Sequence, residues 1–475
     1  MNELKRDTDL LYGYPMPDAK RVDALLEEVV AGNCGKIIVL DDDPTGVQTV
    51  HDVSVYTDWS IDSIRAGFKE ESKLFFVLTN SRGFTTSQTT IAHKEIAENV
   101  DKVAKEQNQN YLMISRSDST LRGHYPLETE LLREVMEARN EWKVDGEILC
   151  PFFKEGGRFT IDNVHYVKYG EQLVPAGQTE FAQDETFGYK SSNLCEYVEE
   201  KTKGVFHKEN CICITLDMLR NMDITAIEDM LLNVTGFQKI IVNAIDDMDV
   251  KIFSIALYRA MARGKHFIIR SAAALVKAAG HISDRPLLNR TELLQDKKQL
   301  GGIIVVGSHT KKTTAQLEEL QKIDKIRFIE MNSDLVLKGD ELEKETKRIL
   351  LEEERLIKDG ITVCVSTKRT LLKVDNDTPE EALIRSVKIS DALKNCVGKL
   401  KVTPAFVLAK GGITSSDVGI KALRVKRANV LGQIQPGIPV WQTGEESLFP
   451  GIPYIIFPGN VGNEDTLRKA VEILL

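Results

Sequence analysis

The sequence KIIVLDDDPTG, residues 36–46, combines the two features that decide the fold of this 475-residue chain. A mainly apolar run comes first, and an acidic turn that contains Pro44 and Gly46 follows directly. An apolar run without alternating polar residues is typical of a strand buried on both faces, as in a parallel sheet. The acidic turn then lies at the carboxyl end of that strand, which is where α/β sheets bind ligands.

The same succession of apolar run, turn and amphipathic segment recurs along the chain. The runs that predict strands fall into two series: 36–40, 74–78, 111–115, 147–152, 211–216, 239–245 and 266–270, then 302–306, 326–331, 361–365, 405–409 and 453–457. Helical patterns lie between them, for example at 86–105, 126–139, 248–263, 312–322 and 379–395. The predicted fold class is therefore α/β, with two domains that are each a mainly parallel β-sheet flanked by helices, and with a cleft between them.

A polar segment separates the two series of predicted strands. Residues 281–300 are polar and include Pro286. We therefore expect one domain at 1–285 and a second at 300–475. A further stretch, 153–190, is rich in glycine and aromatic residues and has no clear period, so it is expected to be a lid or an excursion.

Composition restricts the classes of partner. The chain has 62 Lys and Arg residues against 71 Asp and Glu, a net charge of −9, which argues against nucleic acid as a partner. No apolar run approaches the ~20 residues that span a bilayer, and the amino-terminal residues lack the apolar core of a signal peptide. We expect a cytoplasmic protein that acts on small molecules, with no membrane partner. The oligomeric state stays open, a homodimer included.

Polar clusters follow the strands of the first series. Asp41, Asp42 and Asp43 follow the run 36–40, and carboxylates this close repel one another unless hydroxyls, arginines or a cation meet them. The alternative is an acidic turn at a helix start. The next two strands lead into TNSRG, residues 79–83, and RSDSTLRG, residues 116–123. Hydroxyls there also suit helix caps, but the arginines with an aspartate favour a site for a small hydroxylated anion.

The second series has turns of another kind. GSHT at 307–310, KGGITSSD at 410–417 and PGNVGN at 458–463 each follow a predicted strand. Small residues let backbone N–H groups approach a phosphate closely, although a plain β–α turn has the same composition. The familiar phosphate and dinucleotide motifs, GxxxxGK[ST] and GxGxxG after a strand, are absent from the sequence.

The order DDDPTG, NSRG, RSDSTLRG, GSHT, KGGIT and PGNVG resembles the four-carbon acid sugar kinases, from about residue 36 to residue 475. That resemblance implies an acid-sugar-binding domain followed by a nucleotide-binding domain. It also implies transfer of phosphate from ATP to the 4-hydroxyl of a tetronate such as erythronate, threonate or 3-oxo-tetronate. Two departures stand out: Ile413 where the family has an acidic residue, and PGNVG where it tends to have SGNFG.

The resemblance also implies roles for individual residues. The residues that match the sugar-acid side are Asp42, Asp43, Arg82, Asp118, Ser119 and Arg122. The residues that match the nucleotide side are Ser308, Gly411, Gly412, Ile413, Thr414 and Gly459. Arg82 and Arg122 would hold the substrate's carboxylate, and Asp118 or Asp42 would accept the proton of its hydroxyl. Mg²⁺ is expected to arrive on ATP, without a dedicated protein metal site.

Two other classes of function remain at this point. The chain could bind a sugar acid or nucleotide without turnover, as a sensor, which Ile413 favours. It could also be a lyase or dehydrogenase acting on hydroxy acids, although the missing dinucleotide motif weakens the redox form. Which sugar acid and which stereochemistry are not determined by the sequence.

Overall fold

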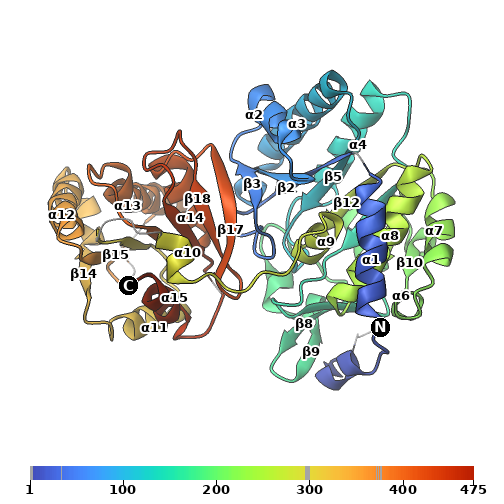
Figure 1. Ribbon diagram of the computed structural model, residues 1–475. Coiled ribbons are helices and arrows are strands. Elements are labelled where there is room, and N and C mark those ends of the chain that lie inside the picture. The colour runs from blue at the N-terminus through green and yellow to red at the C-terminus, as the bar shows by residue number, and fades with distance from the viewer. Residues whose placement is uncertain are drawn as a thin grey trace. The chain divides into compact units, whose positions relative to one another are not determined.

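The computed structural model describes residues 4–33, 35–294, 300–370, 372, 374, 377–459 and 461–475 (Figure 1). The chain forms two compact units. The first contains Met1–Gly46 and Asp58–Asp284, and the second contains Val47–Thr57 and Arg285–Leu475. Segment 47–57 thus lies with the second unit, whereas the sequence placed it in the first domain. The reason is β3 (Val53–Tyr56), which pairs with β17 (Arg427–Gln435) in antiparallel register.

The first unit is built on a parallel sheet with the strand order β10-β11-β6-β12-β5-β2-β4. Its strands are β2 (Lys36–Asp41), β4 (Leu74–Leu78), β5 (Tyr111–Arg116), β6 (Gly146–Cys150), β10 (Ile212–Ile214), β11 (Gln238–Val242) and β12 (Phe267–Ser271). β2, β4, β6 and β12 are buried at every position, as their uninterrupted apolar runs predict. The predicted α/β class is confirmed.

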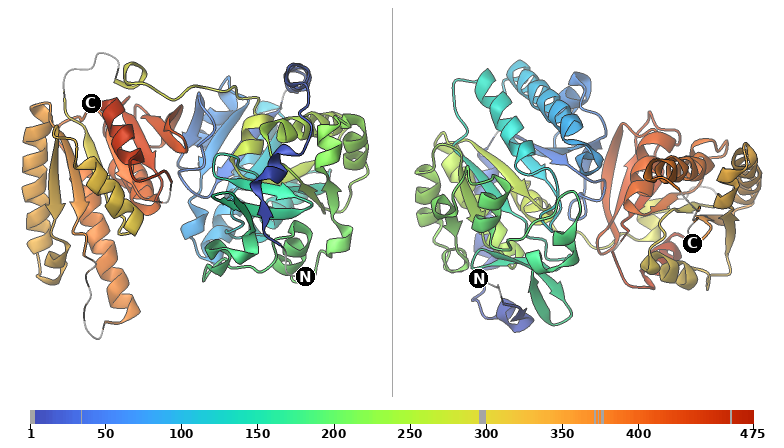
Figure 2. Two further views of the ribbon diagram at one scale, coloured as in Figure 1. Left: turned by 90° about the horizontal axis from the view of Figure 1, so that it is seen from below. Right: turned by 180° about the vertical axis from the view of Figure 1, so that it is seen from behind.

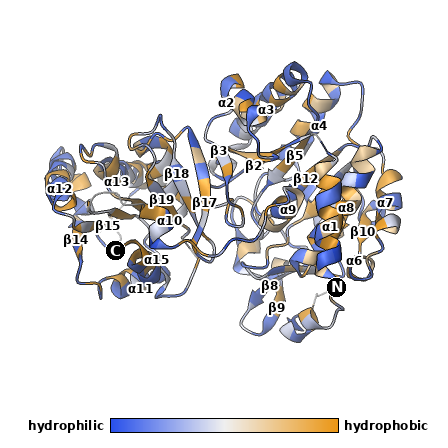
Figure 3. Ribbon diagram, viewed as in Figure 1, coloured by the Kyte–Doolittle hydropathy of each residue, from blue (hydrophilic) through white to orange (hydrophobic). Residues whose placement is uncertain are grey.

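Helices flank this sheet. They are α1 (Ala19–Ala31), α2 (Ile61–Lys69), α3 (Thr86–Gln107), α4 (Leu127–Arg139), α5 (Leu194–Lys201), α6 (Leu216–Arg220), α7 (Ile224–Leu232), α8 (Asp247–Ala262) and α9 (Ala273–Ala279). Figure 3 shows orange, hydrophobic segments along α8. α8 is packed between α1, α7 and α9, so little of it reaches solvent.

The aperiodic stretch after β6, expected to be a lid or an excursion, contributes three strands to a small antiparallel sheet. Its order is β1-β9-β8-β7, with β1 (Arg6–Asp7), β7 (Arg158–Ile161), β8 (Val164–Tyr169) and β9 (Gln172–Pro175). Asp162 and Asn163, both at positive φ, form the turn between β7 and β8. Positive φ at both central positions is typical of a tight hairpin turn, and Asp and Asn tolerate it best after glycine.

The second unit has a mixed sheet with the order β3-β17-β18-β19-β16-β13-β15-β14. The parallel part contains β13 (Ile303–Val306), β14 (Ile326–Met331), β15 (Thr362–Thr367), β16 (Val407–Lys410) and β19 (Pro453–Phe457). The hairpin of β17 and β18 (Ile438–Thr443) adds antiparallel strands. Pro436 and Gly437 form its turn, and Gly437 has the positive φ of +77° that a type II turn needs.

The helices of the second unit complete its layers. They are α10 (Arg290–Leu294), α11 (Lys311–Leu320), α12 (Glu341–Lys358), α13 (Pro379–Gly398), α14 (Gly412–Asp417) and α15 (Thr466–Leu474). α12 and α13 pack side by side (Figure 2). Within the described residues, no helix is both long and apolar enough to cross a bilayer.

A buried carboxyl stands out in the described part of the second unit. Glu353 on α12 is fully buried, and neither of its carboxyl oxygens has a hydrogen-bond partner in the described chain. Burial, reinforced by Glu354 and Glu352, raises its pKa well above the ordinary 4.5. The carboxyl is therefore protonated in the folded protein and ionises on unfolding, so its contribution to stability falls as pH rises above about 4.5.

Replacement of Glu353 by Gln or Leu should therefore stabilise the protein at neutral pH. We expect the free energy of unfolding to rise by about 1–3 kcal/mol at pH 8, and by less at pH 5. Urea unfolding at the two pH values measures this difference. The exposed Glu318→Gln serves as the control, because it changes the same charge without burial. A loss of stability in both Glu353 variants would show that the carboxyl is paired.

Candidate functional site

The acidic turn after β2 is neutralised by arginine. Arg82, which follows β4, donates from Nη2 to Asp42 Oδ1 at 2.7 Å and from Nε to Asp42 Oδ2 at 3.2 Å. Its Nη1 lies 3.4 Å from Asp43 Oδ2, and the hydroxyl of Thr45 donates to Asp43 at 2.6 Å. Burial raises the pKa of Asp42, whereas Arg82 and Thr45 outweigh burial at Asp43 and lower its pKa. At this sheet edge Arg82 thus meets the charges of both Asp42 and Asp43.

Asp41, the last residue of β2, lies deeper. Arg116 at the end of β5 donates to Asp41 Oδ1 at 3.3 Å. Burial raises the pKa of Asp41 to about 7, against the opposing charge of Arg116. A Cβ on Gly46 would lie 1.8 Å from Asp41 Oδ2, so only glycine fits the turn that covers this carboxyl. Asp41 is therefore a structural part of the turn.

The loop that follows β5 holds the second aspartate. Arg122 donates from Nε to Asp118 Oδ2 at 2.6 Å, and Thr120 also donates its hydroxyl to that oxygen. Burial would raise the pKa of Asp118, but the guanidinium groups of Arg82 and Arg122 hold it well below the ordinary 3.8. The side chain of Asp118 is still 13% exposed. It is thus a carboxylate that is ionised at neutral pH and lies within reach of a ligand.

Side chains from α5 and the preceding segment fix the backbone of this loop. Tyr189 donates its hydroxyl to the carbonyl of Thr120 at 2.7 Å, and Tyr197 donates to the carbonyl of Leu121 at 2.8 Å. Leu121 has a φ of +69°, an unfavourable value that the tyrosine contacts help to maintain. The loop is therefore preorganised rather than free to rearrange.

Ser119, predicted to bind substrate, is held through its backbone. Nε2 of His165 lies 2.7 Å from the carbonyl oxygen of Ser119, and Nδ1 lies 3.0 Å from the hydroxyl of Thr160. Burial lowers the pKa of His165 to about 4, so the ring is neutral. Because a carbonyl only accepts, Nε2 carries the proton. This contact ties the loop to the small antiparallel sheet.

A buried ion pair that the sequence did not reveal lies next to the same loop. Arg270, near the end of β12, donates from Nη1 to Glu128 Oε2 and to the hydroxyl of Ser117, both at 2.8 Å. Its Nη2 donates to the carbonyl of Arg122 at 3.2 Å, and Ser81 donates to Glu128 Oε1 at 2.8 Å. The pair thus connects the loops that follow β4 and β5 with the end of β12 and fixes their relative positions.

In the second unit, the predicted nucleotide residues line one cavity of about 480 Å³. All of them contribute: Ser308, Gly411, Gly412, Ile413, Thr414 and Gly459. Gly411 has a φ of +116°, and a Cβ there would lie 3.3 Å from the Cβ of Ser308. The side chain of Ile413 is 79% exposed at this cavity. Asn460 of the final predicted turn lies outside the described residues.

Lys410, the last residue of β16, directly precedes the glycines that line this cavity, and the sequence assigned it no role. It is fully buried and donates from Nζ to the carbonyls of Pro458 at 2.7 Å and Gly459 at 3.1 Å. Burial, with a smaller effect from Lys312, lowers its pKa to about 7. The lysine thus ties the turn after β19 to the turn after β16.

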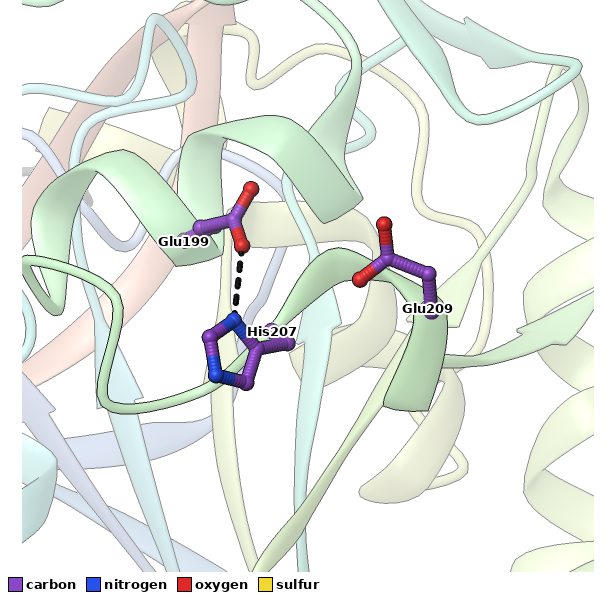
Figure 4. Close-up of side chains that lie close together, drawn as sticks. All are labelled: Glu199, His207 and Glu209. Carbon is purple, nitrogen blue, oxygen red and sulfur yellow. Dashed lines mark hydrogen bonds and ion pairs between the residues drawn. The ribbon is translucent and has the colours of Figure 1, made fainter.

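The described residues offer one group with the spacing of metal ligands. Glu199, His207 and Glu209 lie together on the surface, and Nδ1 of His207 is 3.0 Å from Glu199 Oε1 (Figure 4). None of them is among the predicted site residues, and exposed acidic groups of this kind are common without an ion. We assign them no role.

Family models match both units in the expected order. The family described as "Sugar-binding N-terminal domain" matches residues 37–279, and that described as "Nucleotide-binding C-terminal domain" matches residues 303–467. The chain belongs to the four-carbon acid sugar kinase family. The resemblance read from the sequence motifs is confirmed, and so is the presence of a sugar-binding and a nucleotide-binding domain.

Solved structures of other proteins have a fold similar to that of this chain. A Haemophilus influenzae protein of family DUF1537 superposes with a TM-score of 0.60 at 16% identity, covering 92% of this chain and all of the other. A Salmonella typhimurium protein, provisionally described as a tRNA synthase, gives a TM-score of 0.66 at 14% identity, covering 92% of this chain and 98% of the other. At such identities the likeness concerns the fold alone. No curated protein matches the chain by sequence.

Proposed function

We propose that this chain is an ATP-dependent kinase that phosphorylates the terminal hydroxyl of a four-carbon sugar acid of the erythronate, threonate or 3-oxo-tetronate type. The observation that carries the proposal is the presence of two preorganised sites, one in each of the matched family domains. One is an ionised aspartate held by Arg122, and the other is a cavity whose lining includes Ser308, Thr414 and glycines of the predicted turns. Phosphoryl transfer needs mainly positioning and neutralisation of charge, which such sites provide.

In the sugar-acid site, Asp118 is proposed to orient the terminal hydroxyl and to accept its proton. Asp118 is more accessible than Asp42, whose side chain is 2% exposed and held by two hydrogen bonds from Arg82. The low pKa of Asp118 suits a loose transition state, in which the hydroxyl needs alignment more than full deprotonation. Asp42, Asp43 and Ser119 are proposed to shape the remainder of the substrate site.

In the nucleotide site, Ser308, Gly411, Gly412, Thr414 and Gly459 are proposed to surround the phosphates of ATP. The positive φ of Gly411 and the lack of room for a Cβ support close approach of the backbone. The exposed side chain of Ile413 is proposed to contact the nucleotide without hydrogen bonds. Mg²⁺ bound to ATP would supply neutralisation of the phosphate charge, and the hydroxyls of Ser308 and Thr414 fit such a ligand.

Lys410 provides a test of the nucleotide site. Polyphosphate near Lys410 should raise its pKa from about 7, so binding takes up a proton and weakens as pH rises above 7. Lys410→Met should lower affinity for an ATP analogue about tenfold, since the two turns lose a shared anchor. Calorimetry in buffers of different ionisation enthalpy measures both effects. The exposed Lys338→Met is the control. If nucleotide binding to Lys410→Met took up as many protons as binding to the wild type, Lys410 would not be the group that gains the proton.

The proposed activity is tested by ADP release, coupled to a spectrophotometric signal, across a panel of tetronates, threonates and 3-oxo acids. We expect one acid or a narrow set to stimulate ADP release above the rate without acceptor. Binding of acid and nucleotide without stimulation by any acid would instead support a sensor. Redox change of an added nicotinamide cofactor would support a dehydrogenase.

A further inference from the structure

The arginines around Asp118 differ in what they bind. Arg82, Arg116, Arg122 and Arg270 each have a carboxylate of the chain within ion-pair distance, at 2.7, 3.3, 2.6 and 2.8 Å respectively. The sequence assigned the substrate's carboxylate to Arg82 and Arg122. A substrate carboxylate that bound Arg82 or Arg122 would leave a buried aspartate without its partner. This loss would lower the affinity for the substrate several-fold to thousands-fold.

Arg158, the first residue of β7, is different. In the described part of the chain no carboxylate lies within 4.0 Å of its guanidinium, and Nη1 donates only to the carbonyl of Gly156. Its Nε is buried without a hydrogen-bond partner, and no hydrogen bond of Nη2 occurs among these residues. A largely buried guanidinium normally pairs with an anion, since its desolvation is otherwise uncompensated.

The surroundings place Arg158 at the sugar-acid site. The guanidinium carbons of Arg122 and Arg158 lie 5.2 and 5.4 Å from the centre of the same ring, that of Phe181. Asp118 is the carboxylate with the largest electrostatic effect on Arg158. Burial, with a contribution from Arg122, lowers the pKa of Arg158, so the cation favours a further negative charge. Arg158 thus shares an aromatic ring with Arg122, the arginine that holds the group proposed to orient the substrate hydroxyl.

The backbone holds Arg158 in place. Its N–H donates to the carbonyl of Phe153 at 2.9 Å and its carbonyl accepts from the N–H of Phe153 at 3.1 Å. Gly157 before it has a φ of +73°, and a Cβ there would lie 3.1 Å from the Cβ of Lys168. The turn that presents Arg158 is therefore fixed by the small antiparallel sheet, as binding of a charged ligand group requires.

We propose that Arg158 binds the carboxylate of the substrate acid, while Arg82 and Arg122 position the aspartates of the site. This inference rests on the proposed function for the class of substrate. The small antiparallel sheet then determines specificity, since its strand β7 supplies the arginine that discriminates an acid from the matching uncharged polyol or amide. No such role could be predicted for residues 153–190 from the sequence.

Calorimetric titration with erythronate or threonate, whichever acid the wild type binds, and with its uncharged amide tests the proposal. Arg158→Met should weaken binding of the acid about 30-fold or more and change binding of the amide by less than about threefold. Arg158→Lys should recover part of the preference for the acid, because it restores a charge without the planar fork. Arg263→Met, which removes an exposed arginine, should change neither.

Three outcomes would overturn the assignment: an unchanged preference for the acid in Arg158→Met, equal loss of acid and amide binding, or no binding of either acid by the wild type. Thermal unfolding of each variant identifies a folding defect. If Arg158→Met does not fold, the acid-to-amide preference of Arg158→Lys decides, because an unchanged preference contradicts a bidentate contact. Product formation is followed in parallel. Acid binding that depends on Arg158 without phosphate transfer would refute the kinase proposal and leave this inference standing.

Discussion

Replacement of Asp118 by Asn should lower kcat by about 10²–10⁴-fold, with the fold intact. Asn has nearly the same shape but cannot accept the hydroxyl proton, and it removes the charge held by Arg122 at 2.6 Å. The measurement is steady-state ADP release with a saturating acid acceptor. Asp184→Asn is the matched control, because Asp184 lies farther from Arg122, at 3.6 Å. This substitution should reduce kcat only slightly.

The pH dependence separates Asp118 from Asp42 as the proton acceptor. Because the pKa of Asp118 lies below its ordinary value, its carboxylate stays ionised from about pH 5 upward, and kcat should show no acidic limb there from this group. The pKa of Asp42 is raised, so a mechanism that used Asp42 would lose activity at a higher pH as the group protonates. Wild-type kcat in Asp118→Asn, with such an acidic limb, would transfer the role to Asp42.

Replacement of Gly411 by Val should abolish measurable nucleotide binding and leave sugar-acid binding unchanged. A φ of +116° disfavours any side chain by roughly 1–3 kcal/mol, and the added carbons would enter the cavity against Ser308. Calorimetry with an ATP analogue and, separately, with the acid measures the two affinities.

Gly339→Val controls for backbone strain alone. Gly339 has a φ of +54° but no atom within 4 Å of its added Cβ, so this variant should bind nucleotide normally. Wild-type affinity for the analogue in Gly411→Val would place the nucleotide elsewhere. Equal loss in both glycine variants would attribute the effect to unfolding of the second unit.

Much of the fold was predictable because buried parallel strands have an unmistakable pattern. The predicted strands from 36–40 to 453–457 all correspond to strands of the two sheets. The β17–β18 hairpin was missed, since β17 alternates between buried and half-buried positions and contains Gly432. β7–β9 were missed because glycines and aromatic residues obscure the short alternation. Only pairing with distant strands establishes such segments.

The candidate sites were predictable to the level of the sheet edge. Residues that follow parallel strands meet at one edge, which brings Asp42 close to Arg82 across forty positions of sequence. The sequence could not say which charge each arginine binds. Arg82 and Arg122 both hold aspartates of the chain, whereas Arg158, whose guanidinium has no carboxylate within ion-pair distance among the described residues, belongs to a stretch without a motif. Glu128 and Arg270 were likewise indistinguishable from surface charges, because burial depends on tertiary packing.

The central claim is transfer of the γ-phosphate of ATP to the terminal hydroxyl of a four-carbon sugar acid. Phosphorus NMR of a reaction containing the purified protein, MgATP and the acid selected by the ADP-release panel tests it most directly. We expect a phosphomonoester signal coupled to the protons of the terminal carbon, appearing together with ADP and absent with Asp118→Asn or Gly411→Val. ADP formed together with free inorganic phosphate, and no phosphomonoester with any acid of the panel, would contradict the account.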